Sequence, residues 1–134
     1  MRLTPLGFEP RVIVVTAGRT VGFENRDTLY HGVLCVSRAK RSGTGLYAPG
    51  QRRQVRFDRP GIVNLFCELQ PEFAGFVVIR PDRLFAQPDA SGEFRLPRIA
   101  EGTYIVKAWH PIYGETSQRV IVPRKAHTIV RLTL

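Results

Sequence analysis

Apolar positions along the chain come in short runs rather than in long stretches. The runs are rich in Val, Ile, Phe and Thr, and Gly, Pro, Asn and Asp separate them, a pattern typical of β-strands joined by tight turns. Ten such runs lie at residues 12–16, 20–24, 31–36, 54–57, 62–66, 75–79, 92–96, 103–109, 119–122 and 128–134. No window holds a sustained apolar period of about 3.6 residues, so we expect helices to be minor.

Short strands at this spacing predict an all-β chain folded as one β-sandwich or two. The length of 134 residues fits one ordinary domain or two small ones that share a core. A boundary is expected near RPDRL (80–84), where an apolar run ends at a proline and polar residues follow. We therefore place one domain at residues 4–80 and a smaller β module at residues 81–134.

Composition narrows the class of protein. A hydrophobic fraction of 43% is enough for a packed interior, and no run of 18 or more apolar residues is present, so we expect no transmembrane segment. We do not expect the opening MRLTPLGFEP to act as a secretory leader, because it is too short and too broken by Pro and Gly. Either the chain works where it is made or a leader has been removed. Two cysteines do not make a disulfide-rich scaffold.

Positive charge is concentrated in one segment of the chain. The chain carries a formal net charge of +9, and residues 38–59 hold seven Lys or Arg against one acid, Asp58. The segment is either a solvated basic surface or a docking face for an acidic protein or an anionic membrane face. We expect no nucleic-acid binding, because no DNA- or RNA-binding motif is present. The expected docking residues are Arg38, Lys40, Arg41, Arg52 and Arg53, with Leu46 and Tyr47 as an apolar anchor on the exposed loop RSGTGLYAPG.

His31 and Cys67 are the candidate metal ligands. His31 begins one apolar run and Cys67 ends another, so the two can meet at one end of a sandwich. Imidazole and thiolate from separate strands are the ligands of a blue-copper site, which adds a second His and a weak axial Met. Cys35 lies on the same strand face as His31, about 13 Å along the strand. We expect Cys35 to be a small buried residue, with a Cys35–Cys67 disulfide as the less favoured alternative.

The framework around these residues resembles the cupredoxins. The stretches FEPRVIVVTAGRTVGFENRDTLYHGVLCVS and FDRPGIVNLFCELQPEFAGFVVI are similar to the plastocyanin-like proteins of methylamine-utilisation type. The stretch FAQPDASGEFRLPRIAEGTYIVKAWHP resembles a transthyretin-like or carboxypeptidase-regulatory-like module. The resemblance implies a cupredoxin-like Greek-key β-sandwich followed by a smaller transthyretin-like β-sandwich, and a periplasmic location.

The ligand loop departs from the family pattern C-x-x-H-x-x-M. Gln70 stands where the second His is expected, and Phe73 stands where the axial Met is expected. A Gln amide oxygen is a poor copper ligand beside imidazole. Neither His110, beside Trp109 in the tail motif, nor His127, in a terminal run, is expected to replace the missing ligand. We therefore expect no bound cofactor, with copper in a weak or unusual site as the alternative.

These features favour a binding or structural protein over an enzyme. Paired carboxylates, a G-x-S-x-G motif and a Gly-rich phosphate loop are all missing, and the family framework explains His31 and Cys67 without a nucleophilic Cys–His dyad. We predict a non-catalytic accessory protein or subunit of a larger, membrane-associated complex. The alternatives are a copper-binding electron-transfer protein with an altered site and, by analogy of fold alone, a glycan-binding module.

Overall fold

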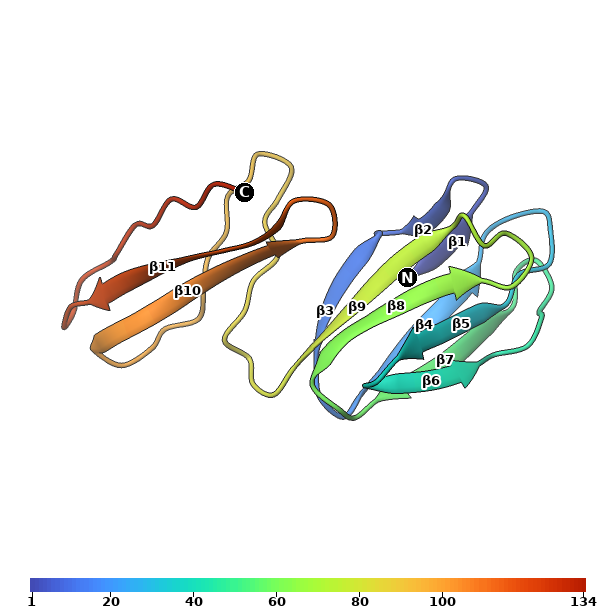
Figure 1. Cartoon of the computed structure of the whole chain (residues 1–134), viewed down its shortest axis with the longest axis horizontal. Coiled ribbons are helices and arrows are strands. Elements are labelled where there is room, and N and C mark those ends of the chain that lie inside the picture. Colours follow the sequence, from blue (N-terminus) through green and yellow to red (C-terminus); the bar gives the residue numbers. More distant parts are fainter. The chain divides into compact units, whose positions relative to one another are not determined.

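The computed structural model describes all of residues 1–134 and contains strands but no helix (Figure 1). The chain divides into two compact units, Met1–Leu96 and Pro97–Leu134. Nine strands lie in the first unit: β1 (Arg2–Thr4), β2 (Gly7–Glu9), β3 (Val12–Thr16), β4 (Arg19–Asn25), β5 (Val33–Ser37), β6 (Lys40–Gly43), β7 (Arg52–Phe57), β8 (Gly61–Cys67) and β9 (Ala74–Arg80). Two strands lie in the second unit: β10 (Gly102–His110) and β11 (Gly114–Val122).

The first unit is a sandwich of two sheets. One sheet has the strand order β2-β1-β4-β7 and the other the order β3-β9-β8-β5-β6. Strand β1 is parallel to β4 and β3 is parallel to β9, whereas the remaining pairs are antiparallel. The mixture of parallel and antiparallel neighbours shows that the sheets are not built from hairpins alone.

The core of the first unit lies between these sheets. Alternate residues of each strand point inward, as the two-residue period of a strand requires. Leu3, Phe23 and Phe57 come from one sheet, and Val63 and Leu65 come from the other; all five side chains are fully buried. Burial of each such side chain contributes about 1.5–3 kcal/mol of hydrophobic free energy. The core fixes the ends of β4, β5 and β8, which carry the candidate site.

Eight of the ten predicted strands are confirmed, and two are wrong. Residues 92–96 and 128–134 form no strand. Gly92 has a φ of +86° and belongs to a turn in which the Asp89 side chain accepts the backbone NH groups of Ser91 and Glu93. Residues 128–134 have the apolar pattern of a strand but no neighbouring strand with which to form a ladder. Strands β1, β2 and β6 were not predicted, because two are only three residues long and the third reads KRSG.

The second unit has a single two-stranded sheet rather than the two sheets expected of a small sandwich. Strands β10 and β11 pair antiparallel from Gly102↔Val122 to His110↔Gly114. Val120 is its only buried hydrophobic residue, and one side chain cannot support a second sandwich core. No helix long and apolar enough to cross a membrane is present anywhere in the chain.

The predicted boundary at residue 80 coincides with the end of β9 at Arg80. Residues 81–96, however, group with the first unit. Within that segment the Gln87 side chain donates to the carbonyl of Val12 and accepts the backbone NH of Val14. These two hydrogen bonds occupy part of the outer edge of β3, which has no neighbouring strand on that side.

Candidate functional site

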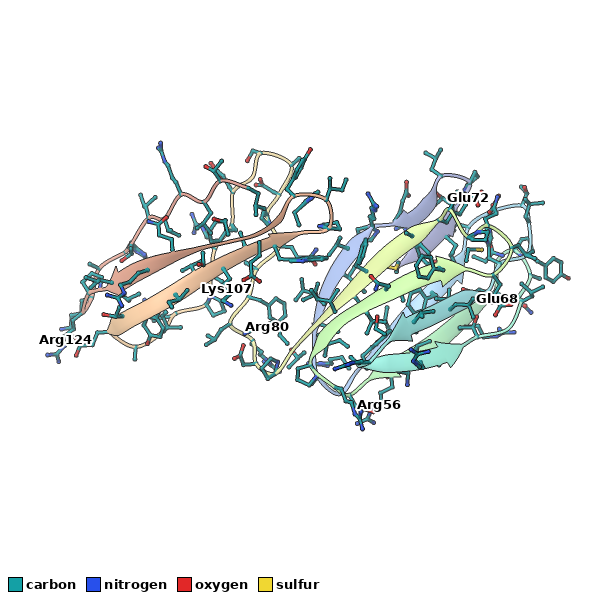
Figure 2. The ribbon with its side chains drawn as sticks, in the orientation of Figure 1. Arg56, Glu68, Glu72, Arg80, Lys107 and Arg124 are labelled. Carbon is teal, nitrogen blue, oxygen red and sulfur yellow. The ribbon has the colours of Figure 1, made fainter.

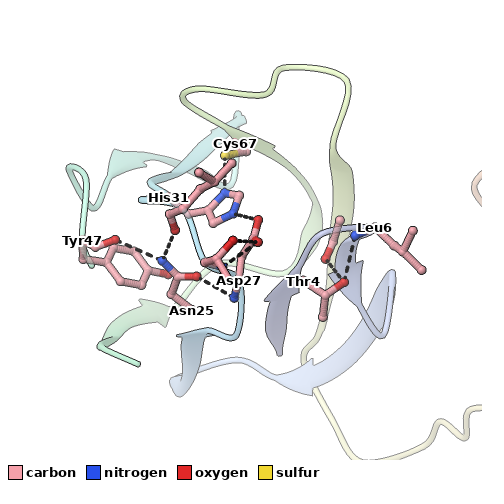
Figure 3. A network of polar contacts seen from close by, with 10 residues as sticks. Thr4, Leu6, Asn25, Asp27, His31, Tyr47 and Cys67 are labelled. Carbon is pink, nitrogen blue, oxygen red and sulfur yellow. Dashed lines mark hydrogen bonds and ion pairs between the residues drawn. The ribbon is translucent and has the colours of Figure 1, made fainter. Parts of the chain in front are cut away.

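His31 and Cys67 meet at one end of the sandwich, as the sequence predicts. Cys67 is the last residue of β8, and its backbone lies opposite Val33 at the start of β5. His31 precedes β5 and is fixed by two backbone hydrogen bonds with Tyr47. The distance from His31 Nδ1 to Cys67 Sγ is 3.0 Å, and both side chains are buried (Figure 3). The two groups therefore form a hydrogen-bonded pair that is shielded from solvent.

Asp27 extends this pair into a three-residue network. Its Oδ2 atom lies 2.7 Å from His31 Nε2, and its Oδ1 atom accepts the backbone NH of Thr28 at 2.6 Å. The hydrogen bond with His31 holds the pKa of Asp27 below its usual value, and the Thr28 NH acts in the same direction. A carboxylate on Nε2 assigns a proton to that nitrogen, so the imidazole presents Nδ1 to the sulfur.

Asn25 holds the loop that carries Asp27. Its side-chain amide donates to the carbonyls of Leu29 and Tyr47 at 2.8 and 3.1 Å, and its Oδ1 atom accepts the backbone NH of Asp27 at 3.0 Å (Figure 3). Neither Asn25 nor Asp27 was predicted from the sequence to belong to the site. The available signal was the pair of short polar side chains in NRD, because Asn and Asp stabilise turns by bonding to nearby backbone.

Phe73 and Gln70 occupy the remaining positions of the ligand loop. The Phe73 ring is stacked with the His31 ring at a centroid distance of 6.4 Å, and its backbone NH donates to the carbonyl of Gln70. The Phe73 ring also lies close to Gly7. Gln70 Oε1 is buried and has no hydrogen-bond partner. Such an orphaned acceptor costs about 1–3 kcal/mol, so this loop contains one unfavourable feature that a donor or a cation would relieve.

The residues present do not fit a blue-copper centre. That centre needs two imidazoles and a thiolate in a trigonal arrangement with a weak axial ligand. Here the set contains one imidazole and one thiol, and no group of three His, Cys, Asp or Glu side chains is placed to hold a metal ion. The Nδ1–Sγ contact of 3.0 Å is a hydrogen bond, which a metal between the two atoms would have to break.

The other cysteine and histidines lie elsewhere. Cys35 is buried, and both cysteines are free, so the disulfide alternative is wrong. Burial raises the pKa of the Cys35 thiol, which keeps it protonated and consistent with a packing role. His110 and His127 belong to the second unit, where the His110 ring stacks with Tyr113 and its Nδ1 accepts the backbone NH of Ile112.

Residues 38–59, the basic segment, differ from the sequence-based prediction in two respects. Residues 40–43 and 52–57 are strands β6 and β7, so the segment is not one exposed loop. Tyr47 is 1% exposed, its hydroxyl donates to the carbonyl of Phe23, and the Arg53 guanidinium lies over its ring at 5.1 Å. Tyr47 is therefore a core residue and cannot anchor a partner. Leu46, 47% exposed, is still accessible.

Comparison with known proteins identifies the fold. No protein-family model matches the sequence. Similar solved structures include the "novel purple cupredoxin" of Nitrosopumilus maritimus, with 20% identity, a TM-score of 0.51, and coverage of 55% of this chain and 82% of that one. The reduced form of a point mutant of amicyanin has 21% identity and a TM-score of 0.53, with coverage of 60% of this chain and 81% of that one.

A third similar structure is the copper-containing nitrite reductase of Thermus scotoductus SA-01. It has 22% identity and a TM-score of 0.53, and the match covers 59% of this chain but only 22% of the reductase. Together these likenesses show that the chain contains a β-sandwich of the cupredoxin fold. At these levels of identity they show the fold alone.

Proposed function

We propose that this chain is a non-catalytic binding or structural protein in which a copper site has become vestigial. One observation carries the proposal: the hydrogen bond between His31 Nδ1 and Cys67 Sγ, at 3.0 Å, where a copper protein would hold its metal. Asp27 orients His31, and Phe73 covers it. A buried polar pair that is hydrogen-bonded internally needs no cation to stabilise it.

A copper titration tests this proposal directly. The purified chain is mixed with copper under mild reduction and then oxidised, and metal content, visible absorption and melting temperature are measured. We expect no intense thiolate-to-copper absorption and no stabilisation, because a ligand that binds the folded state must raise its stability. An intense visible band with a stoichiometric metal content would refute the vestigial site.

A specific observation favours one alternative, an electron-transfer protein with an altered copper site. The orphaned Gln70 Oε1 is a buried oxygen donor on the ligand loop, and structures with this fold include the copper-containing nitrite reductase. In this alternative, Gln70 would complete a three-donor set with His31 and Cys67. Copper binding that is lost in Gln70→Leu but retained in Glu72→Gln would favour this alternative over the vestigial site.

The proposed role is docking to a larger complex through the basic segment. The exposed cations Arg38, Arg41 and Arg52 offer a surface to an acidic protein or to a complex at an anionic membrane face. Lys40 and Arg53 are half-buried and contribute less. The family resemblance supports a periplasmic location and favours a transthyretin-like module for residues 81–134, which include the β10–β11 hairpin.

Co-purification from membranes tests the docking role. Recovery of partner proteins is compared at low and high salt for wild type and for a variant with five substitutions to Ser, at Arg38, Lys40, Arg41, Arg52 and Arg53. We expect the variant to recover less at low salt and both proteins to recover little at high salt, because the attraction between exposed charges is screened over about 8 Å at physiological ionic strength. Equal recovery by both proteins at both salts would remove the docking role.

A further inference from the structure

A second candidate site lies at the end of the sandwich away from Cys67. A hollow of about 300 Å³ is formed there by the turn between β5 and β6 and the turn between β7 and β8. The hollow is open to solvent on one side. Its lining residues are Arg38, Ala39, Arg59, Pro60, Gly61 and Ile62.

The two arginines in this hollow have no partner for their charges. Neither Arg38 nor Arg59 takes part in an ion pair or a side-chain hydrogen bond. The acid nearest in sequence, Asp58, is bound to Arg56 through a contact of 2.7 Å between Oδ1 and Nε. Two like charges around one concave surface repel each other, and an anion between them removes that repulsion.

Two acidic side chains lie at the end of the first unit away from the hollow. Figure 2 shows Glu68 and Glu72 on the loop after Cys67, whereas Arg56 lies at the opposite end of the sandwich, where β7 ends. The unpaired Arg38 and Arg59 lie on the turns at this second end. The lining of the hollow holds two arginines and no acid, so the hollow attracts an approaching anion.

The rest of the lining is apolar. Ala39 packs close to Gly61, since a Cβ atom built on Gly61 would lie 3.2 Å from the Cβ of Ala39. Ile62 is 40% exposed, and Pro60 adds a rigid apolar surface beside it. A ligand with a charged head and a small apolar substituent would therefore meet both kinds of surface.

We propose that this hollow binds a phosphate group that carries an organic substituent. Guanidinium groups match the oxygens of phosphate through paired, charge-assisted hydrogen bonds, which makes arginine the preferred side chain for this anion. Arg38 and Arg59 bind the phosphate oxygens, and Ile62 and Pro60 contact the substituent. The ligand is a soluble phosphomonoester or the headgroup of an anionic lipid, because both present the same chemistry. The inference shares Arg38 with the docking role but names a different ligand, and it stands if no protein partner binds.

The test uses the full chain and phenyl phosphate as the probe. Binding is measured by calorimetry and by amide chemical shifts at constant ionic strength, for wild type, Arg38→Gln and Arg59→Gln. The matched control is Arg2→Gln, an exposed arginine at the start of β1. Its strand partner Glu24 lies about 16 Å along β4 from Arg19, which pairs with Phe57 where β7 ends. We expect each hollow variant to bind about tenfold more weakly, because each loses a hydrogen bond to a charged group.

The possible results distinguish a soluble phosphomonoester from a lipid headgroup, and they also include results that would refute phosphate binding in the hollow. In wild type, the amide shifts should concentrate at Ala39 and Gly61. In a second experiment, binding of the chain is measured to phosphatidylcholine vesicles with and without phosphatidic acid. Binding that requires phosphatidic acid and depends on Arg38 and Arg59 identifies a lipid headgroup as the ligand. Binding of phenyl phosphate alone identifies a soluble phosphomonoester. Failure of wild type to bind either probe, or equal weakening by Arg2→Gln, overturns the proposal and leaves the docking role to its own test.

Discussion

Restoring the missing ligands should restore copper binding if the loop after Cys67 has the geometry of a cupredoxin site. The perturbation is the double substitution Gln70→His with Phe73→Met. The Gln70 side chain has an unpaired buried oxygen, so its replacement removes an unfavourable group. Phe73 is half-buried and packs against the core, and replacement by Met keeps a large flexible apolar group. We therefore expect the metal-free variant to lose no more than about 1.5 kcal/mol of stability.

The gain on adding copper follows from linkage. At a copper concentration about one hundred times the dissociation constant, binding to the folded state adds about 2.7 kcal/mol. In a domain of this size each kcal/mol corresponds to about 4–8 °C, so the melting temperature should rise by roughly 10–20 °C. Thermal melts with and without copper, together with visible spectra, measure both effects. Wild type should show neither.

Two controls make the result decisive. Adding Cys67→Ser to the double variant should abolish both the colour and the stabilisation, since the thiolate is a soft ligand that a hydroxyl does not replace. Gln70→His alone should bind copper more weakly or with an altered spectrum. A double variant that folds but stays colourless would show that Gln70 and Phe73 do not occupy ligand positions, and that the assignment of this loop is wrong.

Two further predictions concern the sandwich itself. Phe23→Ala should destabilise the first unit by about 3–5 kcal/mol, because the ring is fully buried, whereas Leu6→Ala, at 87% exposed, should change stability by less than about 0.5 kcal/mol in urea unfolding. Gly75→Ala should cost about 1–3 kcal/mol, because the new Cβ would lie 2.9 Å from the Phe8 ring. The cost should be smaller in a Phe8→Ala background, which removes the Cγ atom and the ring. An equal cost in both backgrounds would assign it to the backbone instead.

The strands that the sequence predicted are runs rich in β-branched and aromatic residues, bounded by turn residues. Strand β8 reads GIVNLFC, an apolar run that is visible in the letters alone, and its Val63, Leu65 and Cys67 are the residues that alternate into the core. Strand β6 reads KRSG and is held only by its ladder to β5, so nothing in its own residues indicates a strand. Conversely, residues 128–134 have the composition of a strand but form none, because a strand also needs a neighbouring strand with which to form hydrogen bonds. No strand of the chain lies beside this segment, and the composition of the segment itself could not show that.

The part of the site that could be predicted is the pair His31 and Cys67, because their positions at the ends of two strands can be read from the sequence. His31 and Cys67 sit at strand ends, and their convergence follows once both strands belong to one sandwich. Asp27 could not be placed in this way, because its contact with His31 depends on a loop conformation that Asn25 fixes through backbone hydrogen bonds. Tyr47 was misassigned because its Gly- and Ser-rich surroundings indicate an exposed loop, whereas its ring enters the core and its hydroxyl finds a backbone carbonyl there.

The buried Tyr47 hydroxyl should make the stability of the first unit depend on alkaline pH. Burial raises the pKa of Tyr47 well above its usual value, and the charge of Arg53 opposes this shift only in part. Because the folded-state pKa exceeds the unfolded value of about 10, this contribution to stability is fully present below that pH and is lost as the pH rises above it.

Tyr47→Phe should be less stable at neutral pH by about 1–3 kcal/mol, since the carbonyl of Phe23 loses its buried donor. Above a pH of about 10 the difference in free energy of unfolding between wild type and Tyr47→Phe should shrink, because only wild type exposes an ionising phenol at this position on unfolding. Urea unfolding of both proteins from neutral to alkaline pH measures the difference, and a constant gap throughout would show that Tyr47 ionises as readily in the folded chain as in the unfolded one.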